Sequence, residues 1–135
     1  MSSRTLFLSR LLGLYCIVMA LSMFLRGQAM ADTVTSMLGN APLMLVLGIV
    51  VVIAGLAMVL THNIWSGGTL TVLVTLAGWI ALIKGALFLI VPPASSGAFF
   101  LNGFHYQQLF YVYAAIALIV GLYLTYGGFR SASRA

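Results

Sequence analysis

Four long apolar runs, separated by short polar connections, occupy most of the chain. They cover about residues 6–26, 42–61, 69–91 and 105–126. About 20 helical residues match the ~30 Å hydrocarbon core of a bilayer, because each residue adds 1.5 Å. The pattern therefore predicts an all-α fold, a four-helix transmembrane bundle that forms a single integral membrane domain over residues 1–135.

Polar residues, glycine and proline mark the ends of the predicted spans. Asn40 and Pro42 predict the start of the second span, since proline is tolerated in the first turn of a helix. Residues 61–68 predict a tight turn after it, with Trp65 at the membrane interface. Residues 27–41 are expected to be a polar connection, and residues 94–103 a loop that dips into the interface.

The first apolar run has a second interpretation. Basic residues precede it and Ala29-Met30-Ala31 follows it, as in a cleavable secretory signal. However, the run is nearly long enough to span a bilayer, and Arg26 interrupts the region before the cleavage site. We interpret it as a retained first span.

Composition excludes a soluble globular protein. The 135 residues are 63% hydrophobic and 5% charged, whereas soluble domains carry about 25% charged residues. The formal net charge of +5 does not indicate nucleic-acid binding, because five basic residues lie at span ends or near the termini: Arg4, Arg10, Arg26, Arg130 and Arg134. The expected partner is the lipid bilayer.

The same arginines predict the orientation of the chain. Four of them flank the side that holds both termini, and Arg26 alone flanks the other side. Because short cytoplasmic flanks carry the excess of basic residues, we expect a multi-pass protein with both termini in the cytoplasm.

Small residues recur along the chain with a period of about 65 residues. Shifting the first span by 65 residues, and the second by 66, superposes small residues that would let helices approach closely. Two interpretations stay open: two tandem helical hairpins related by a pseudo-twofold along the membrane normal, or a chance alignment. The predicted packing residues are Gly13, Cys16, Ala20, Gly48, Gly55, Ala77, Ala81, Gly85, Ala114 and Gly121.

Lys84 is the one charged residue well inside an apolar run. A charge at the centre of a span costs about 2.5–3.5 kcal/mol on insertion scales and marks a candidate functional site. The spacing places Lys84 on the side of Ala77 and Ala81. It either reaches the headgroups along its own side chain or binds an anion, and Asp32, the only acid, is its one possible carboxylate partner.

Candidate residues for catalysis or metal binding are few. His62 and His105 are assigned to opposite faces of the membrane, and the chain has one cysteine and no glutamate. A zinc or di-iron site therefore lacks ligands, and no acid/base pair or activated nucleophile is evident. We expect no enzyme activity, no metal and no cofactor, and we expect His62 to cap the second span.

Two motifs carry a resemblance to a known family. His62-Asn63-Ile64-Trp65-Ser66-Gly67-Gly68, and then Thr75 to Gly85 with Trp79 and Lys84, resemble an uncharacterised family of four-span bacterial inner-membrane proteins with the pattern HNxWxGG…TLxGWxxLxKG. The resemblance implies a bacterial inner (cytoplasmic) membrane location and carries over no activity. It also implies that Trp79, Lys84 and the His62 turn act as one unit.

These observations lead to two expectations for function. The first is a non-enzymatic accessory or scaffold subunit that packs against itself, as a homo-oligomer, or against a larger membrane complex. The alternative is a homo-oligomeric anion channel or small transporter that uses Lys84. The candidate functional residues are Lys84, Trp79, His62, Asn63, Trp65, Arg26 and Asp32.

Overall fold

A computed structural model of the protein describes residues 2–134, and within this range the secondary structure is entirely helical. Four helices are long and apolar enough to cross a membrane: α1 (Ser3–Arg26), α3 (Ala41–Thr61), α4 (Thr69–Ile90) and α6 (Phe110–Ser133). The predicted all-α fold with four spans is confirmed. The last span begins later than predicted, because His105 adopts a left-handed φ of 49° and the chain enters regular helix only at Phe110.

The two connections predicted as polar linker and loop are largely helical. Helix α2 (Gln28–Leu38) occupies the first, and α5 (Pro93–Ala98) followed by the π-helical turn η1 (Phe99–Gly103) occupies the second. Both predictions were wrong on this point. In α2, Ala31, Val34 and Leu38 recur at helical spacing, and Ala31 and Leu38 are buried. This short apolar stripe is masked in the sequence by the threonines and serine around it.

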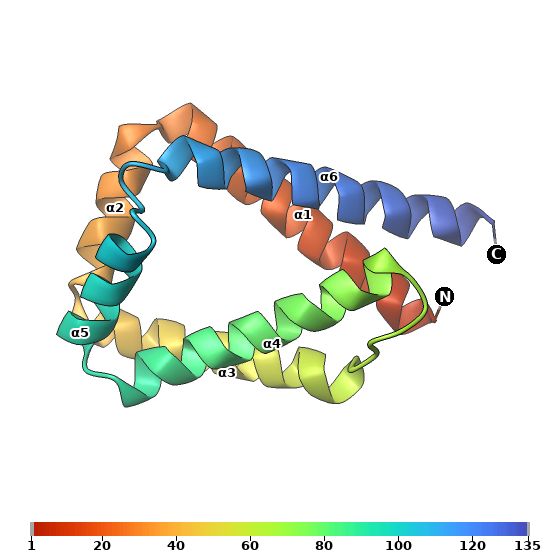
Figure 1. Ribbon diagram of the computed structural model, residues 1–135, viewed down its shortest axis with the longest axis horizontal. Coiled ribbons are helices and arrows are strands. Elements are labelled where there is room, and N and C mark those ends of the chain that lie inside the picture. The colour runs from red at the N-terminus through yellow and green to blue at the C-terminus, as the bar shows by residue number, and fades with distance from the viewer. Residues whose placement is uncertain (1, 135) are drawn as a thin grey trace.

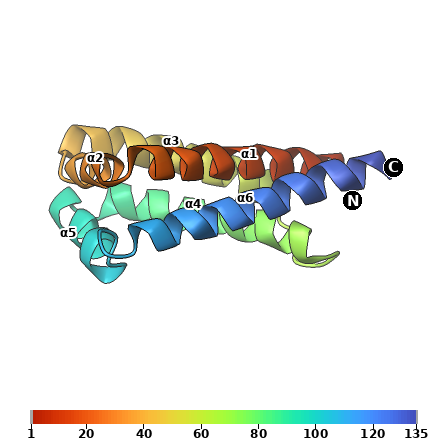
Figure 2. The same cartoon turned by 90° about the horizontal axis from the view of Figure 1, so that it is seen from above.

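The two halves of the chain form two layers. Figure 2 shows α1, α2 and α3 in one layer and α4, α5 and α6 in the other. Each layer consists of two long helices joined by short helical structure. Figure 1 shows both termini at one end of the molecule, which we call the terminal end. Helices α2 and α5 lie at the opposite end, which we call the connector end.

Close packing occurs between the layers, in two helix pairs. Helix α1 lies along α6, and α3 lies along α4. The long helices of one half of the chain thus pack against those of the other half, and not against each other within one half. Exchanging α1 with α4 and α3 with α6 converts one pair into the other, so this pairing follows the pseudo-twofold that the sequence repeat suggests.

Equivalent glycines make equivalent contacts in the two pairs. A Cβ built on Gly55 would lie 2.5 Å from the amide nitrogen of Leu82, and one on Gly121 would lie 2.9 Å from that of Ile17. Gly55 and Gly121 are 66 residues apart, and Ile17 and Leu82 are 65 apart. The repeat therefore describes the packing of the backbones as well as the sequence.

Burial follows the same repeat. Near the connector end, Met23 packs in a buried cluster with Phe110 of α6, and Phe88 packs in a second cluster with Met44 of α3. Met23 corresponds to Phe88, and Met44 to Phe110, under the same two shifts. Chance alignment of small residues does not account for matched contacts and matched burial along both pairs.

The two pairs are joined to each other mainly near the terminal end. There Leu8, Leu70, Val74 and Leu124, from α1, α4 and α6, form one buried cluster. At the connector end the two clusters of the pairs stay separate, and the pairs diverge (Figure 1). The structure is thus a helical bundle made of two tight pairs rather than one uniformly packed core.

The outer faces of all four long helices are apolar. Large side chains such as Val18, Ile53, Ile90 and Ile119 are more than half exposed. An apolar surface of this extent is incompatible with water and matches a hydrocarbon environment. The protein is a multi-pass membrane protein.

Adding a methyl group at the glycine contacts is expected to destabilise the protein. Gly55→Ala and Gly121→Ala should each lower the free energy of unfolding by about 1–3 kcal/mol, because the new Cβ meets backbone that cannot move aside. Unfolding in detergent, followed by circular dichroism, measures this loss. Gly39→Ala is the matched control, since its Cβ would lie 3.6 Å from the nearest atom. Equal stability of all three variants would contradict the role of these contacts.

Candidate functional site

A cavity of about 470 Å³ lies between the two helix pairs, toward the connector end. Ile80, Lys84 and Phe88 lie on one face of α4 at a spacing of four residues and line it. The facing pair contributes Tyr113 of α6. The other lining residues come from α2, α3, η1 and the segment before α6: Val34, Met37, Leu38, Leu47, Phe100, Phe104 and Tyr106.

Lys84 supplies the only charge in this lining. Its Nζ lies 5.6 Å from the ring centroid of Phe88 and 6.0 Å from that of Phe100. Both distances suit a cation–π contact, which is worth about 0.5–2 kcal/mol. Within residues 2–134, no lysine or arginine nitrogen lies within 4.0 Å of an Asp32 carboxylate oxygen. Among the described residues, the ammonium group therefore has aromatic rings beside it but no carboxylate counter-charge.

Arg26 and Asp32 lie away from this cavity, at the connector end. The guanidinium of Arg26 donates to the hydroxyl of Thr33 at 3.1 Å, and Asp32 accepts a hydrogen bond from Gln28 at 3.1 Å. Neither residue lines the cavity. The structure therefore does not bring Lys84, Arg26 and Asp32 together. Arg26 and Asp32 instead form hydrogen bonds with polar residues of α2.

An aromatic cluster lies beside the cavity at the connector end, and two of its members, Phe100 and Phe104, line the cavity. Phe99, Phe100 and Phe104 pack in edge and stacked contacts with centroids 5.6–5.7 Å apart. The hydroxyl of Tyr113 donates to the carbonyl oxygen of Phe104, which ties this segment to α6. Burial raises the pKa of the Tyr106 phenol, which also lines the cavity. The sequence predicted a loop here and missed these lining residues.

His62 lies at the terminal end, where it joins three helices. Its backbone N–H caps α3, as predicted, by donating to the carbonyl of Met58 at 2.7 Å. The imidazole is buried, with Nε2 at 2.8 Å from the hydroxyl of Thr5 and Nδ1 at 3.1 Å from that of Thr75. The ring therefore connects the end of α3 to both α1 and α4.

The Thr75 hydroxyl fixes the tautomer of His62. It donates to the carbonyl of Ile64 at 2.7 Å and accepts from the amide of the same residue at 3.2 Å. With its single proton used, it accepts from His62 Nδ1–H, and Nε2 then accepts from Thr5. The histidine has a structural role, and Thr5 and Thr75 are partners that sequence reasoning missed.

The adjacent turn is held by one asparagine. Asn63 Oδ1 accepts hydrogen bonds from the indole nitrogens of Trp65, at 2.8 Å, and Trp79, at 3.2 Å. Trp79 and Lys84 are five residues apart and so point about 140° away from each other. The motif residues therefore do not form one unit with Lys84, because Trp79 faces the turn while Lys84 faces the cavity.

The predicted packing residues mostly lie inside the two pairs. Gly13, Gly48, Gly55, Gly85 and Gly121 approach the facing helix so closely that a Cβ would lie within 3.0 Å of it, and Ala20 and Ala114 are fully buried. Cys16 contacts this interface through its Cβ, 3.0 Å from the position of a Cβ on Gly121. Ala77 and Ala81 are half-buried, and the closest approach on α4 is at Leu82 and Gly85 instead.

Comparison with known proteins adds no family to this description. No protein-family model matches the chain, and neither the curated proteins nor the solved structures contain a match. Among residues 2–134, no three side chains of the His, Cys, Asp or Glu type come together as metal ligands. The chemistry of the cavity therefore rests on Lys84 and the aromatic side chains around it.

Replacing the Thr75 hydroxyl is expected to weaken the terminal end. Thr75→Val keeps the shape but leaves the backbone of Ile64 and the Nδ1–H of His62 without their partner. An unsatisfied buried polar group costs about 1–3 kcal/mol, so the midpoint of thermal unfolding should fall. Thr69→Val, at an exposed position on the same helix, is the control. A drop of the same size in both variants would argue against the His62 network.

Proposed function

We propose that this protein is a non-enzymatic small transporter that binds an amphipathic anion in the Lys84 cavity. One observation supports the proposal above the others. A lysine ammonium group lines a cavity between the two helix pairs and has no carboxylate counter-charge among residues 2–134. A positive charge without a counter-charge inside a transmembrane helix costs free energy, and a bound anion offsets that cost.

The walls of the cavity define the rest of the ligand. Phe88, Phe100, Phe104 and Tyr113 present rings, and the remaining lining is almost entirely aliphatic. Such a surface favours an apolar or aromatic body over a hydrated inorganic ion. The substrate class is therefore a small organic anion with one charged end, and Lys84 is the residue that binds this end.

The position of the cavity favours transport over static binding. In many transporters the substrate binds at the interface between internal repeats, and access alternates when one unit moves against the other. Here the cavity is lined by both halves of the chain, and it includes the equivalent residues Leu47 and Tyr113. The buried cluster around Leu8 and Leu70 and the His62 network close the terminal end.

The accessory or scaffold subunit is the alternative proposal, and the short connections between the spans support it. The small residues Gly55, Gly85 and Gly121 contact the chain's own helices, so a partner would have to pack against other surfaces. A homo-oligomer stays compatible with the transporter proposal, because the outer apolar faces are free to meet lipid or a second copy.

We further propose that the chain lies in a bacterial inner membrane with its terminal end in the cytoplasm. Arg4, Arg10, Arg130 and Arg134 flank that end, and Arg26 flanks the other. Green fluorescent protein fused to the C-terminus should then fluoresce, and alkaline phosphatase fused there should be inactive. The reverse pattern would overturn this orientation.

Uptake into proteoliposomes tests the transporter proposal. Radiolabelled p-toluenesulfonate, a permanent anion with an aromatic body, should enter vesicles that hold the wild-type protein faster than protein-free vesicles. Lys84→Met should reduce this uptake about tenfold, which corresponds to a loss of about 1.4 kcal/mol when the positive charge that pairs with the sulfonate is removed. Lys84→Arg should retain part of it.

Two controls make the result specific. Arg26→Gln removes a positive charge from the connector end without touching the cavity, and it should leave uptake unchanged. Sulfate, which lacks an apolar body, should not enter at the same rate. Wild-type uptake equal to that of empty vesicles, or unchanged uptake in Lys84→Met, would contradict the proposal.

A further inference from the structure

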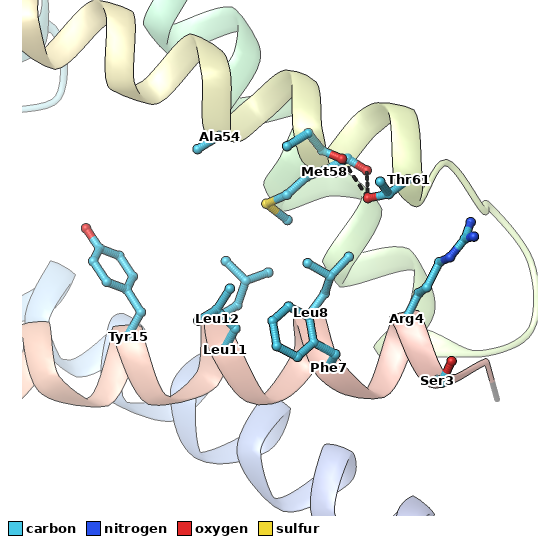
Figure 3. A pocket seen from close by; sticks show the side chains of 11 residues that line it. Ser3, Arg4, Phe7, Leu8, Leu11, Leu12, Tyr15, Ala54, Met58 and Thr61 are labelled. Carbon is cyan, nitrogen blue, oxygen red and sulfur yellow. Dashed lines mark hydrogen bonds between the residues drawn. The ribbon is translucent and has the colours of Figure 1, made fainter.

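A second site lies at the terminal end, on the side of the molecule where α1 and α3 face each other. A groove of about 860 Å³ runs between these two helices, apart from the Lys84 cavity and with no lining residue in common with it. Figure 3 shows Arg4 and Thr61 at one end of the groove and Tyr15 and Ala54 at the other.

The groove exists because α3 presents small side chains to α1. Ala54 and Ala57 lie one turn apart on α3, opposite Phe7, Leu11 and Tyr15 of α1. Its floor is formed by Leu8, Leu12 and Met58, which belong to or pack against the buried cluster that joins the two helix pairs. A ligand in this groove would therefore contact the joint between the pairs.

The dimensions of the groove match one leaflet of a membrane. Arg4 and Tyr15 are 11 residues apart on α1, or about 16 Å at helical rise. Half of the hydrocarbon core of a bilayer measures about 15 Å. An acyl chain that starts at the level of Arg4 would end near Tyr15, and the almost wholly apolar lining suits such a chain.

Charge at the groove end determines the headgroup. Within residues 2–134, the Arg4 guanidinium has no hydrogen-bond partner and no carboxylate near it. In contrast, Arg10 donates to the carbonyl of Gly128 at 3.2 Å, and Arg130 donates to the hydroxyl of Tyr126 at 2.9 Å. Among residues 2–134, Arg4 thus has no partner within the protein at the depth where a lipid phosphate would lie, and arginine binds phosphate in a bidentate manner.

We propose that the α1–α3 groove binds one anionic phospholipid of the leaflet at the terminal end, with its phosphate on Arg4 and an acyl chain along Ala54 and Ala57. Basic pockets between transmembrane helices bind anionic headgroups in this way. The site is independent of the transport proposal, because it uses other residues at the other end of the molecule. Its occupant fills the groove and supports the contact between the helix pairs.

Native mass spectrometry of the full chain in mild detergent tests this site. Titration with phosphatidylglycerol and with phosphatidylcholine of the same acyl chains should show about fivefold tighter binding of the anionic lipid, as expected for one basic residue near a lipid surface. Arg4→Gln should remove this difference. Arg134→Gln, which deletes a charge at the same end but outside the groove, should preserve it.

A groove-filling variant separates binding by the groove from attraction by charge alone. Ala57→Phe places a ring where the acyl chain would lie, and it should weaken the binding of both lipids. Thermal unfolding provides a second readout, since phosphatidylglycerol should raise the unfolding midpoint of the wild type and of Arg134→Gln but not of Ala57→Phe. Equal affinity of the wild type for both lipids would overturn the proposal. A preference retained by Arg4→Gln, or unchanged binding in Ala57→Phe, would also overturn it.

Discussion

The contact of glycine with facing backbone is the interaction on which the rest of this structure depends. In a bilayer, helices gain little from hiding apolar side chains, because lipid is as apolar as leucine, and association rests on dispersion contacts at short range. Gly13, Gly55, Gly85 and Gly121 permit such contacts, since each brings its helix so near the partner that even a methyl group would not fit. Two tight helix pairs result.

The distribution of these glycines also explains the cavity. They lie on the surfaces within each pair, and none of them lies between one pair and the other. The pairs are joined instead by larger side chains near the terminal end, and they diverge toward α2 and α5. Lys84 lies in the space that this divergence leaves. The placement of the glycines therefore explains both the close contacts within the two helix pairs and the cavity between the pairs.

The sequence predicted the spans, and most of their ends, because hydropathy and length determine whether a helix crosses a bilayer. It also predicted the small packing residues. Which helix each would meet was not predictable, because a small-residue face shows that a partner approaches but does not identify it. Helix α2 was missed since only Ala31, Val34 and Leu38 mark its apolar stripe. In the candidate site, Lys84 was predicted because a charge inside a span costs free energy. Phe100, Tyr106 and Tyr113 come together only through the fold.

The pairing of α1 with α6 has a consequence for the synthesis of the protein. Ser9 of α1 donates to the carbonyl of Leu124, 115 residues later in the chain. Helix α1 thus lacks its main native partner until α6 has been inserted, whereas α3 and α4 are neighbours in sequence and can dock as soon as both are in the bilayer. The surface of α1 that packs against α6 must therefore face lipid, or the insertion machinery, until α6 has been translated.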